Sequence, residues 1–240
     1  MKIIKYCLLT LMLVLVFSAC NGNTPNGETN NGTSVQSMEY AGIIIYLPDP
    51  EIDGGVSVER ALQNRRSRRN FTDESISIEQ LSQLLWAAYG ITSENGLRTA
   101  PSAGALYPLE IYAVVGNVDG IKPGVYRYVA EEHKIIRVVD GDVRNELSEV
   151  ALGQRMVAQA PASIFYSAVF ERTTERYCER GIKYVYIEVG HSAQNVYLQA
   201  EALGLGTCAI GAFADDRVRE ILGLPANEMP LYLMPVGYFD

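Results

Sequence analysis

The sequence predicts an α+β fold, with a few strands wrapped by many helices in one domain. From about residue 57 onward, segments with helical periodicity alternate with short apolar runs that are typical of buried strands. Two runs within 124–142 are close enough in sequence to form a hairpin, which turns near Glu132 and His133. The composition is globular, since 48% of the 240 residues are hydrophobic and 20% are charged.

The N-terminal part of this domain begins with two predicted helices. The first covers 57–65. The second covers 77–90, where Ser77 and Gln80 have the spacing of a capping box and Gly90 stands at the far end. Its apolar residues fall on one helical face; they are Ile78, Leu81, Leu84, Leu85 and Ala88. A long loop is expected over 91–108.

The remaining elements follow in the same alternating manner. The strands beyond this loop, other than the hairpin, are predicted over 109–116, 162–170, 206–213 and 231–239. Helical sequence is predicted over 142–159, 183–203 and 215–223.

Residues 1–20 are typical of an export signal. Lys2 and Lys5 give a positive start, and 6–17 form an apolar core too short to span a bilayer as a helix. Small residues precede Cys20, a pattern that resembles a bacterial lipobox and predicts an exported protein with a lipid anchor at Cys20. Phe17 stands where Leu is usual, so secretion without a lipid remains the alternative.

A flexible tether is predicted over 21–39, because it is rich in Asn, Gly and Thr and lacks apolar periodicity. The domain itself is predicted over 40–240. The net charge is −8, and loss of the leader would make it more negative because Lys2 and Lys5 would be removed. A body this acidic argues against nucleic acid as a partner.

Cysteine and histidine are scarce beyond the leader. Cys178 and Cys208 are predicted to be free, largely buried thiols, with pairing between them as the alternative in an exported protein. His133 and His191 are the two histidines of the chain. No multi-ligand metal site is therefore predicted.

Against this acidic background, "RRSRRNF" (65–71) places four arginines around one serine. A solvated basic face is one interpretation. The other is an anion site, most simply for a phosphate, because guanidinium forks and a serine hydroxyl both suit phosphate oxygens.

Two further stretches have small residues that let a flat ligand approach the backbone closely. They are "PSAGALYPLE" (101–110) and "GLGTCAIGAF" (204–213). Gly204 and Gly206 follow a predicted helix and precede a strand, which is the wrong order for a Rossmann fingerprint. A dinucleotide-binding fold is therefore not supported.

Taken together, these three stretches and "EVGHSAQN" (188–195) resemble the FMN-dependent nitroreductase family. The chain is most similar to the branch related to dehydrogenases that aromatise azoline rings in peptide natural products. The resemblance runs from about residue 57 to the C-terminus. It implies that the anion held by the arginines is the FMN phosphate.

The resemblance also implies the site residues. Those on the phosphate and ribityl side of FMN would be Arg65, Arg66, Ser67 and Arg69, with Arg68 pointing away. Those that meet the flavin from a neighbouring subunit would be Ser102, Ala103, Gly104 and Leu106. Those whose backbone N–H groups face the ring edge near N5 would be Ala209, Ile210, Gly211 and Ala212, with Gly211 as a catalytic donor.

The family fold implied is a mixed, largely antiparallel sheet flanked by helices, in an intertwined homodimer with two FMN at its interface. The helix at 183–203 would form the dimer core. Its polar stripe is predicted to form an interfacial hydrogen-bond network, rather than half of a di-iron motif; the stripe consists of Glu188, His191, Asn195 and Gln199.

Two departures from the family pattern bear on function. Where azoline dehydrogenases have a Lys-Tyr pair, this chain has Arg176 and Tyr177. Arginine stays protonated and cannot accept a proton, so these two residues are expected to bind or polarise a substrate. Nitroreductases often carry a basic residue after the last strand, but none follows Arg219, so the N-terminal arginines are expected to hold the phosphate alone.

The sequence therefore predicts an exported FMN-dependent oxidoreductase that passes hydride or electron pairs to or from a small organic substrate in a ping-pong scheme. The electron donor would be NAD(P)H or, in a dehydrogenase reaction, the substrate itself. A tethered flavin or small-ligand binding protein without turnover and a peptide azoline dehydrogenase are the alternatives.

Overall fold

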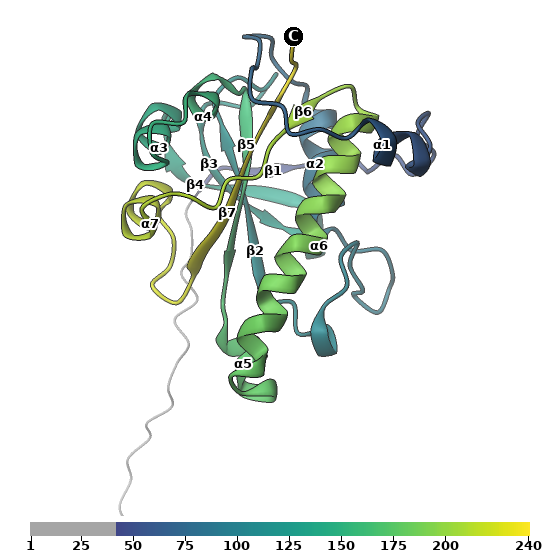
Figure 1. Ribbon diagram of the computed structural model, residues 1–240, viewed down its shortest axis with the longest axis vertical. Coiled ribbons are helices and arrows are strands. Elements are labelled where there is room, and N and C mark those ends of the chain that lie inside the picture. Colours follow the sequence, from purple (N-terminus) through teal and green to yellow (C-terminus); the bar gives the residue numbers. More distant parts are fainter. Residues whose placement is uncertain (1–41) are drawn as a thin grey trace, which may run out of the picture. The chain divides into compact units, whose positions relative to one another are not determined.

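Among residues 42–240, the part of the chain that the computed structural model describes, seven strands form one sheet. Its order is β1-β4-β3-β2-β5-β7-β6, and every neighbouring pair is antiparallel (Figure 1). The strands are β1 (Ile44–Tyr46), β2 (Leu109–Val115), β3 (Gly124–Val129), β4 (Lys134–Asp140), β5 (Ala162–Ala168), β6 (Gly206–Thr207) and β7 (Met229–Gly237). The predicted leader, tether and Cys20 lie outside the described residues.

Helices cover both faces of this sheet (Figure 1). One face packs against α2 (Ile78–Tyr89) and α6 (Arg180–Ala202), and the other against α3 (Arg144–Val150), α4 (Arg155–Gln159) and α7 (Asp215–Leu222). The remaining helices are α1 (Val58–Asn64), α5 (Glu171–Tyr177) and the short 3-10 turns η1 (Ala103–Ala105) and η2 (Ala130–Glu132). The predicted α+β fold is confirmed.

The central strands β2 and β5 have mostly apolar sequences because both of their faces are covered. Every residue of β2 and of β5 is buried. In β2, Ile111 and Ala113 face the α2–α6 side, while Tyr112 and Val114 face the α3–α7 side. A strand covered on both faces needs apolar side chains at successive positions, because neither face meets water.

Local signals placed α2 correctly. The Ser77 hydroxyl accepts a hydrogen bond from the backbone N–H of Gln80 at 3.2 Å, and the Gln80 side chain accepts one from the N–H of Ser77 at 2.9 Å. Gly90 is the C-cap, and its N–H donates to the carbonyl of Trp86. The capping box therefore forms as the sequence predicts.

Three predicted elements differ from the structure, and two observed elements were not predicted. The strand expected over 206–213 ends at Thr207, after which a single bridge joins Ile210 to Leu233. The helical stretch 142–159 is split into α3 and α4, because Leu152 and Gly153 adopt positive φ. The long helix begins at Arg180 instead of 183. The short strand β1 and the helix α5 were not predicted.

Two side-chain predictions are also corrected. Cys178 is exposed, and Cys208 is the buried thiol. In the polar stripe of α6, Glu188, Asn195 and Gln199 hydrogen-bond to residues of the same chain, while His191 is exposed. The stripe fixes α6 against α2 and the 91–108 loop, so its bonds do not require an interface between subunits.

Candidate functional site

The arginine cluster, residues 65–69, begins where α1 ends. Arg65 is the C-cap of α1, and its guanidinium lies 5.1 Å from the centre of the Tyr197 ring. Arg66 turns back onto the helix end, where its Nη1 donates to the carbonyls of Gln63 and Arg65. Arg66 therefore caps α1 in addition to its predicted role at an anion.

Arg68, which the resemblance implies would point away from the flavin, differs from its neighbours in its contacts. Its guanidinium lies 4.4 Å from the centre of the Phe239 ring. Its backbone N–H donates to the carbonyl of Thr207 at 2.9 Å. Its Nε is buried without a hydrogen-bond partner among the described residues. Arg68 thus packs against the C-terminal strand region, whereas Arg66 and Arg69 are exposed.

The cluster carries positive charge that the described part of the chain does not neutralise. None of the ion pairs between described residues involves an arginine of the cluster. Several exposed guanidinium groups without carboxylate partners suit an anionic ligand.

Tyr197, on α6, joins the cluster to the second predicted segment. Its hydroxyl lies 3.0 Å from the Ser67 hydroxyl and accepts a hydrogen bond from the Ala209 N–H at 2.8 Å. Ser67 also forms a parallel bridge with Thr207. The structure therefore brings 65–69 and 209–212 together. The sequence analysis did not identify Tyr197, whose contact with Ser67 spans 130 positions.

The segment 209–212 offers fewer free amides than the resemblance implies. The Ala209 N–H donates to Tyr197, and the Ile210 N–H donates to the Leu233 carbonyl at 2.8 Å. Ile210 also buries its side chain in the core. Gly211 and Ala212 are exposed, and the described residues provide no partner for their N–H groups. The donors available to a ligand are thus those of Gly211 and Ala212.

Cys208, the residue directly before this segment, is a buried thiol. Burial raises the pKa of the Cys208 thiol, and the positive charge of Arg69 acts in the opposite direction. The charge of Arg69 thus acts on the residue directly before 209–212.

The predicted loop residues Ser102, Ala103, Gly104 and Leu106 form a separate group. The Ser102 hydroxyl accepts a hydrogen bond from the Tyr107 N–H at 2.9 Å. Gly104 has φ +66°, and a Cβ there would lie 2.7 Å from the Tyr177 hydroxyl oxygen and 2.9 Å from Nη1 of Arg176. The positive φ favours glycine at this position, and the short distances show that Arg176 and Tyr177 pack directly against the loop.

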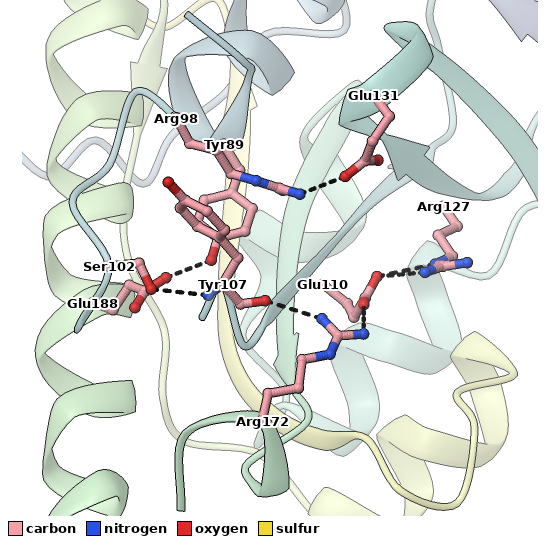
Figure 2. Close-up of polar contacts among 9 residues, drawn as sticks. All are labelled: Tyr89, Arg98, Ser102, Tyr107, Glu110, Arg127, Glu131, Arg172 and Glu188. Atoms are coloured by element: carbon pink, nitrogen blue, oxygen red, sulfur yellow. Dashed lines mark hydrogen bonds and ion pairs between the residues drawn. The ribbon is translucent and has the colours of Figure 1, made fainter. Parts of the chain in front are cut away.

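A buried carboxyl group anchors this loop from α6. Tyr89 donates a short hydrogen bond to Glu188, beside Ser102 (Figure 2). Burial raises the pKa of Glu188, although hydrogen bonds from Tyr89 and Ser102 act in the opposite direction. The Glu188 side chain therefore connects α2, α6 and the start of the loop.

The two groups lie at opposite ends of α6. The loop, Arg176 and Tyr177 lie near its first residue, Arg180, while Tyr197 and β6 lie near its other end (Figure 1). At about 1.5 Å per residue, roughly 25 Å of helix separates Arg180 from Tyr197. One chain therefore presents two half-sites, which we call the arginine half-site (65–69, Tyr197 and 209–212) and the loop half-site (102–106, Arg176 and Tyr177).

No group of three or more His, Cys, Asp and Glu residues gathers within 42–240 to hold a metal ion. Over the same residues, no helix combines the length and apolar character needed to cross a bilayer.

The family model for nitroreductases matches residues 62–238, which include both half-sites. The chain belongs to the nitroreductase family. A relative from Methanocaldococcus jannaschii, provisionally named a nitroreductase, is 50% identical over 193 residues, covering 80% of this chain and 95% of that protein. An FMN reductase [NAD(P)H] of Bacillus subtilis is 26% identical over 195 residues, covering 75% of this chain and 65% of that protein.

A solved structure supports the same assignment. The crystal structure of a protein from Anabaena variabilis, also provisionally named a nitroreductase, superposes with a TM-score of 0.75 at 28% identity. The match covers 83% of this chain and 42% of that one. The family fold is therefore confirmed, and the chain is an oxidoreductase of this family.

Proposed function

We propose that this nitroreductase-family protein binds FMN and uses it to transfer electron pairs to or from a small organic substrate. FMN, when bound, supplies the redox chemistry, because its ring accepts and releases a hydride equivalent. The observation that carries the proposal is the unneutralised arginine cluster of an acidic protein, joined by Tyr197 to exposed backbone amides.

The donor set fits the cofactor. A phosphate needs several charged donors that no carboxylate occupies, and Arg65, Arg69 and the Ser67 hydroxyl supply them at one end of the arginine half-site. Arg66 contributes charge from its position at the end of α1. Arg68 is held against Phe239 and is not expected to take part.

Gly211 and Ala212 fit the ring end of the same cofactor. Their exposed N–H groups are donors held by the backbone, so they need little reorganisation to stabilise negative charge on a ligand. A Cβ at Gly211 would lie 3.6 Å from the Tyr232 ring, an ordinary contact. The requirement at this position is therefore access to the amide, which a side chain would restrict.

A second copy of the chain completes the site in this proposal. The loop half-site lies toward the beginning of α6, whereas the arginine half-site of the same chain lies toward its end. A homodimer would place the 102–106 loop of one chain over the arginine half-site of the other. Arg176 and Tyr177 would then line the substrate side, where Arg176 binds anionic or polar groups but does not accept protons.

The donor and acceptor would bind in turn at this shared cleft, in a ping-pong scheme. NAD(P)H is the proposed electron donor, and the Bacillus subtilis relative, an FMN reductase [NAD(P)H], supports this choice. We further propose that the protein is exported and anchored by a lipid at Cys20, on the sequence pattern alone. Mass spectrometry of the membrane fraction would test the anchor, and a soluble mature chain with another N-terminus would refute it.

The cofactor is the first point to test. Protein purified with its flavin should release FMN on heating, identified against FMN and FAD standards, and should show the absorption bands of a flavin before release. Turnover of NAD(P)H with a nitroaromatic acceptor should give parallel double-reciprocal lines. Release of FAD, or purification without flavin and failure to bind added FMN, would contradict the proposal.

A further inference from the structure

A cavity of about 330 Å³ lies beside the 101–108 loop and shares only Leu106 with the loop half-site. It is formed by the end of α2, the loop, β2, β3 and the start of α5. Its volume is at the lower end of the range of small-molecule pockets, about 300–1,000 Å³. The proposed flavin chemistry uses none of its charged residues.

Three arginines from three separate elements line this cavity: Arg98, Arg127 and Arg172. Two carboxylates, Glu110 and Glu131, line it as well, so the charged groups leave one net positive charge. Figure 2 shows the three guanidinium groups directed toward the same region. The cavity is therefore polar and cationic inside a protein whose net charge is −8.

Glu110 holds two of these arginines in fixed positions. Its Oε2 accepts from Arg127 Nη2 at 2.8 Å and Nε at 3.1 Å, and its Oε1 accepts from Arg172 Nη2 at 2.6 Å. Arg172 Nη1 also donates to the Tyr107 carbonyl at 3.0 Å. The Glu110 side chain is only 8% exposed, so this pair of guanidinium groups is held rigidly.

Arg98 is held differently and keeps an unused donor. Its guanidinium lies 4.4 Å from the centre of the Tyr89 ring and 4.9 Å from that of Tyr107, so two aromatic rings orient it. One Nη donates to Glu131 at 2.7 Å, but the Glu131 side chain is 61% exposed. Arg98 Nε is buried and has no partner among the described residues. Arg98 therefore keeps a donor that no carboxylate of the described residues occupies.

We propose that this cavity binds the carboxylate of a small organic acid. A planar guanidinium matches a carboxylate with two parallel hydrogen bonds, and one net positive charge balances a monoanion better than a phosphate dianion. The apolar walls, which include Leu106, Leu109 and Ile111, would contact the body of the acid.

Two features connect this cavity to the reaction, and this connection rests on the proposed function. Leu106 lines the cavity and is also a predicted flavin contact. Arg172 lies on α5, the same short helix that ends with Arg176 and Tyr177. The acid would therefore be a substrate whose charged end is held in the cavity while its other end points to the loop half-site.

Calorimetric titration of the purified protein with benzoate, with benzamide as the neutral analogue, tests the binding itself. Benzoate should bind and benzamide should bind at least about tenfold more weakly, since the analogue lacks the charge. Arg98→Gln should weaken benzoate binding about tenfold or more. Arg217→Gln, at an exposed arginine that pairs with Glu220, should leave it unchanged.

A second variant tests the same site in the opposite direction and does not endanger the fold. Glu131→Gln removes an exposed competing carboxylate from Arg98, so benzoate should bind several-fold more tightly, whereas Glu220→Gln should have no effect. Absence of benzoate binding, equal binding of benzamide, or Glu131→Gln without effect would overturn the proposal.

Inorganic phosphate and adenosine 2′-phosphate serve as competitors of benzoate, and displacement of benzoate by either with a higher affinity that Arg98→Gln abolishes would also overturn the carboxylate assignment. Because binding is measured without turnover, the result does not depend on whether the cofactor is FMN.

Discussion

At the residue scale, the arginine cluster shows how one run of like residues divides into different roles. Arg68 is fixed by a ring and a backbone hydrogen bond, and Arg66 caps a helix, while Arg65 and Arg69 remain for a ligand. The sequence separates Arg68 from the others only through the family resemblance. The physical reason is Phe239, which lies far away in the sequence and close in the fold.

Arg65→Ala and Arg69→Ala should each weaken FMN binding by about ten- to a hundred-fold, because each removes a charge-assisted hydrogen bond to phosphate. Arg68→Ala should leave the FMN dissociation constant nearly unchanged. It should instead lower the free energy of unfolding by about 0.5–1 kcal/mol through loss of the contact with Phe239. Fluorescence titration with FMN and urea denaturation measure the two effects. Equal FMN affinity in all three variants would mean that the cluster is a solvated face.

Glu188 makes the stability of the fold depend on pH. Burial raises its pKa above the ordinary value of 4.5, so the folded protein binds this proton more tightly than the unfolded chain. The stability that the protonated group contributes is complete below that ordinary pKa and is lost as pH rises through the raised pKa.

The Glu188→Gln variant stays neutral, so the stability of the wild type relative to this variant should fall as pH increases above about 4.5. Urea denaturation of both proteins between pH 4.5 and 8 measures the difference. Glu146→Gln, at an exposed glutamate of α3, is the control and should show no such trend. A constant difference between wild type and Glu188→Gln would show that burial does not perturb this carboxyl.

At the element scale, an element set by local sequence signals was predicted correctly, whereas one set by long-range contacts was not. The helix α2 was predicted with its caps, because the bonds of a capping box join residues three apart. The strand over 206–213 was wrong beyond Thr207, because the amides of Ala209 and Ile210 bond to Tyr197 and Leu233 instead of a continuous ladder. No local pattern contains that information.

The two candidate sites show the same limit. Motifs pointed to the segments 65–69, 102–106 and 209–212 because each is a contiguous run of residues, whereas Tyr197 was missed. The cavity was missed because Arg98, Glu110, Arg127 and Arg172 lie on four different segments that only the sheet and α5 bring together.

Tyr197 connects α6 with two segments of the arginine half-site, and Tyr197→Phe tests this connection. The variant leaves the half-buried Ala209 N–H without its acceptor and frees Ser67, which should cost about 1–3 kcal/mol in stability. FMN affinity should also fall, because Ser67 and the 209–212 segment lose their common support. Urea denaturation and FMN titration measure both. Tyr46→Phe is the control, since its ring is exposed and its hydroxyl has no partner among the described residues. An equal effect of both variants would argue against the role of Tyr197.

At the scale of the whole molecule, the separation of the two half-sites by α6 has a consequence for assembly. The first half of this helix exposes Ile182, Tyr186 and Ile187 to solvent within one chain. Apolar side chains grouped on one helix face are typical of surfaces that a partner covers. A symmetric pair of chains would cover this surface in both copies and place each loop half-site near the other chain's arginine half-site.

We therefore expect the purified protein to be a homodimer whose flavin content depends on assembly. Sedimentation equilibrium should give about twice the mass of the mature chain. Ile187→Glu should place a charge in the covered surface, convert the protein to monomers and, in the same preparation, reduce bound FMN, because the loop half-site is lost from each cofactor. Leu152→Glu, at an equally apolar and more exposed position between α3 and α4, should change neither mass nor flavin content. A monomer that retains stoichiometric FMN would show that one chain holds the cofactor by itself, and the shared site would have to be abandoned.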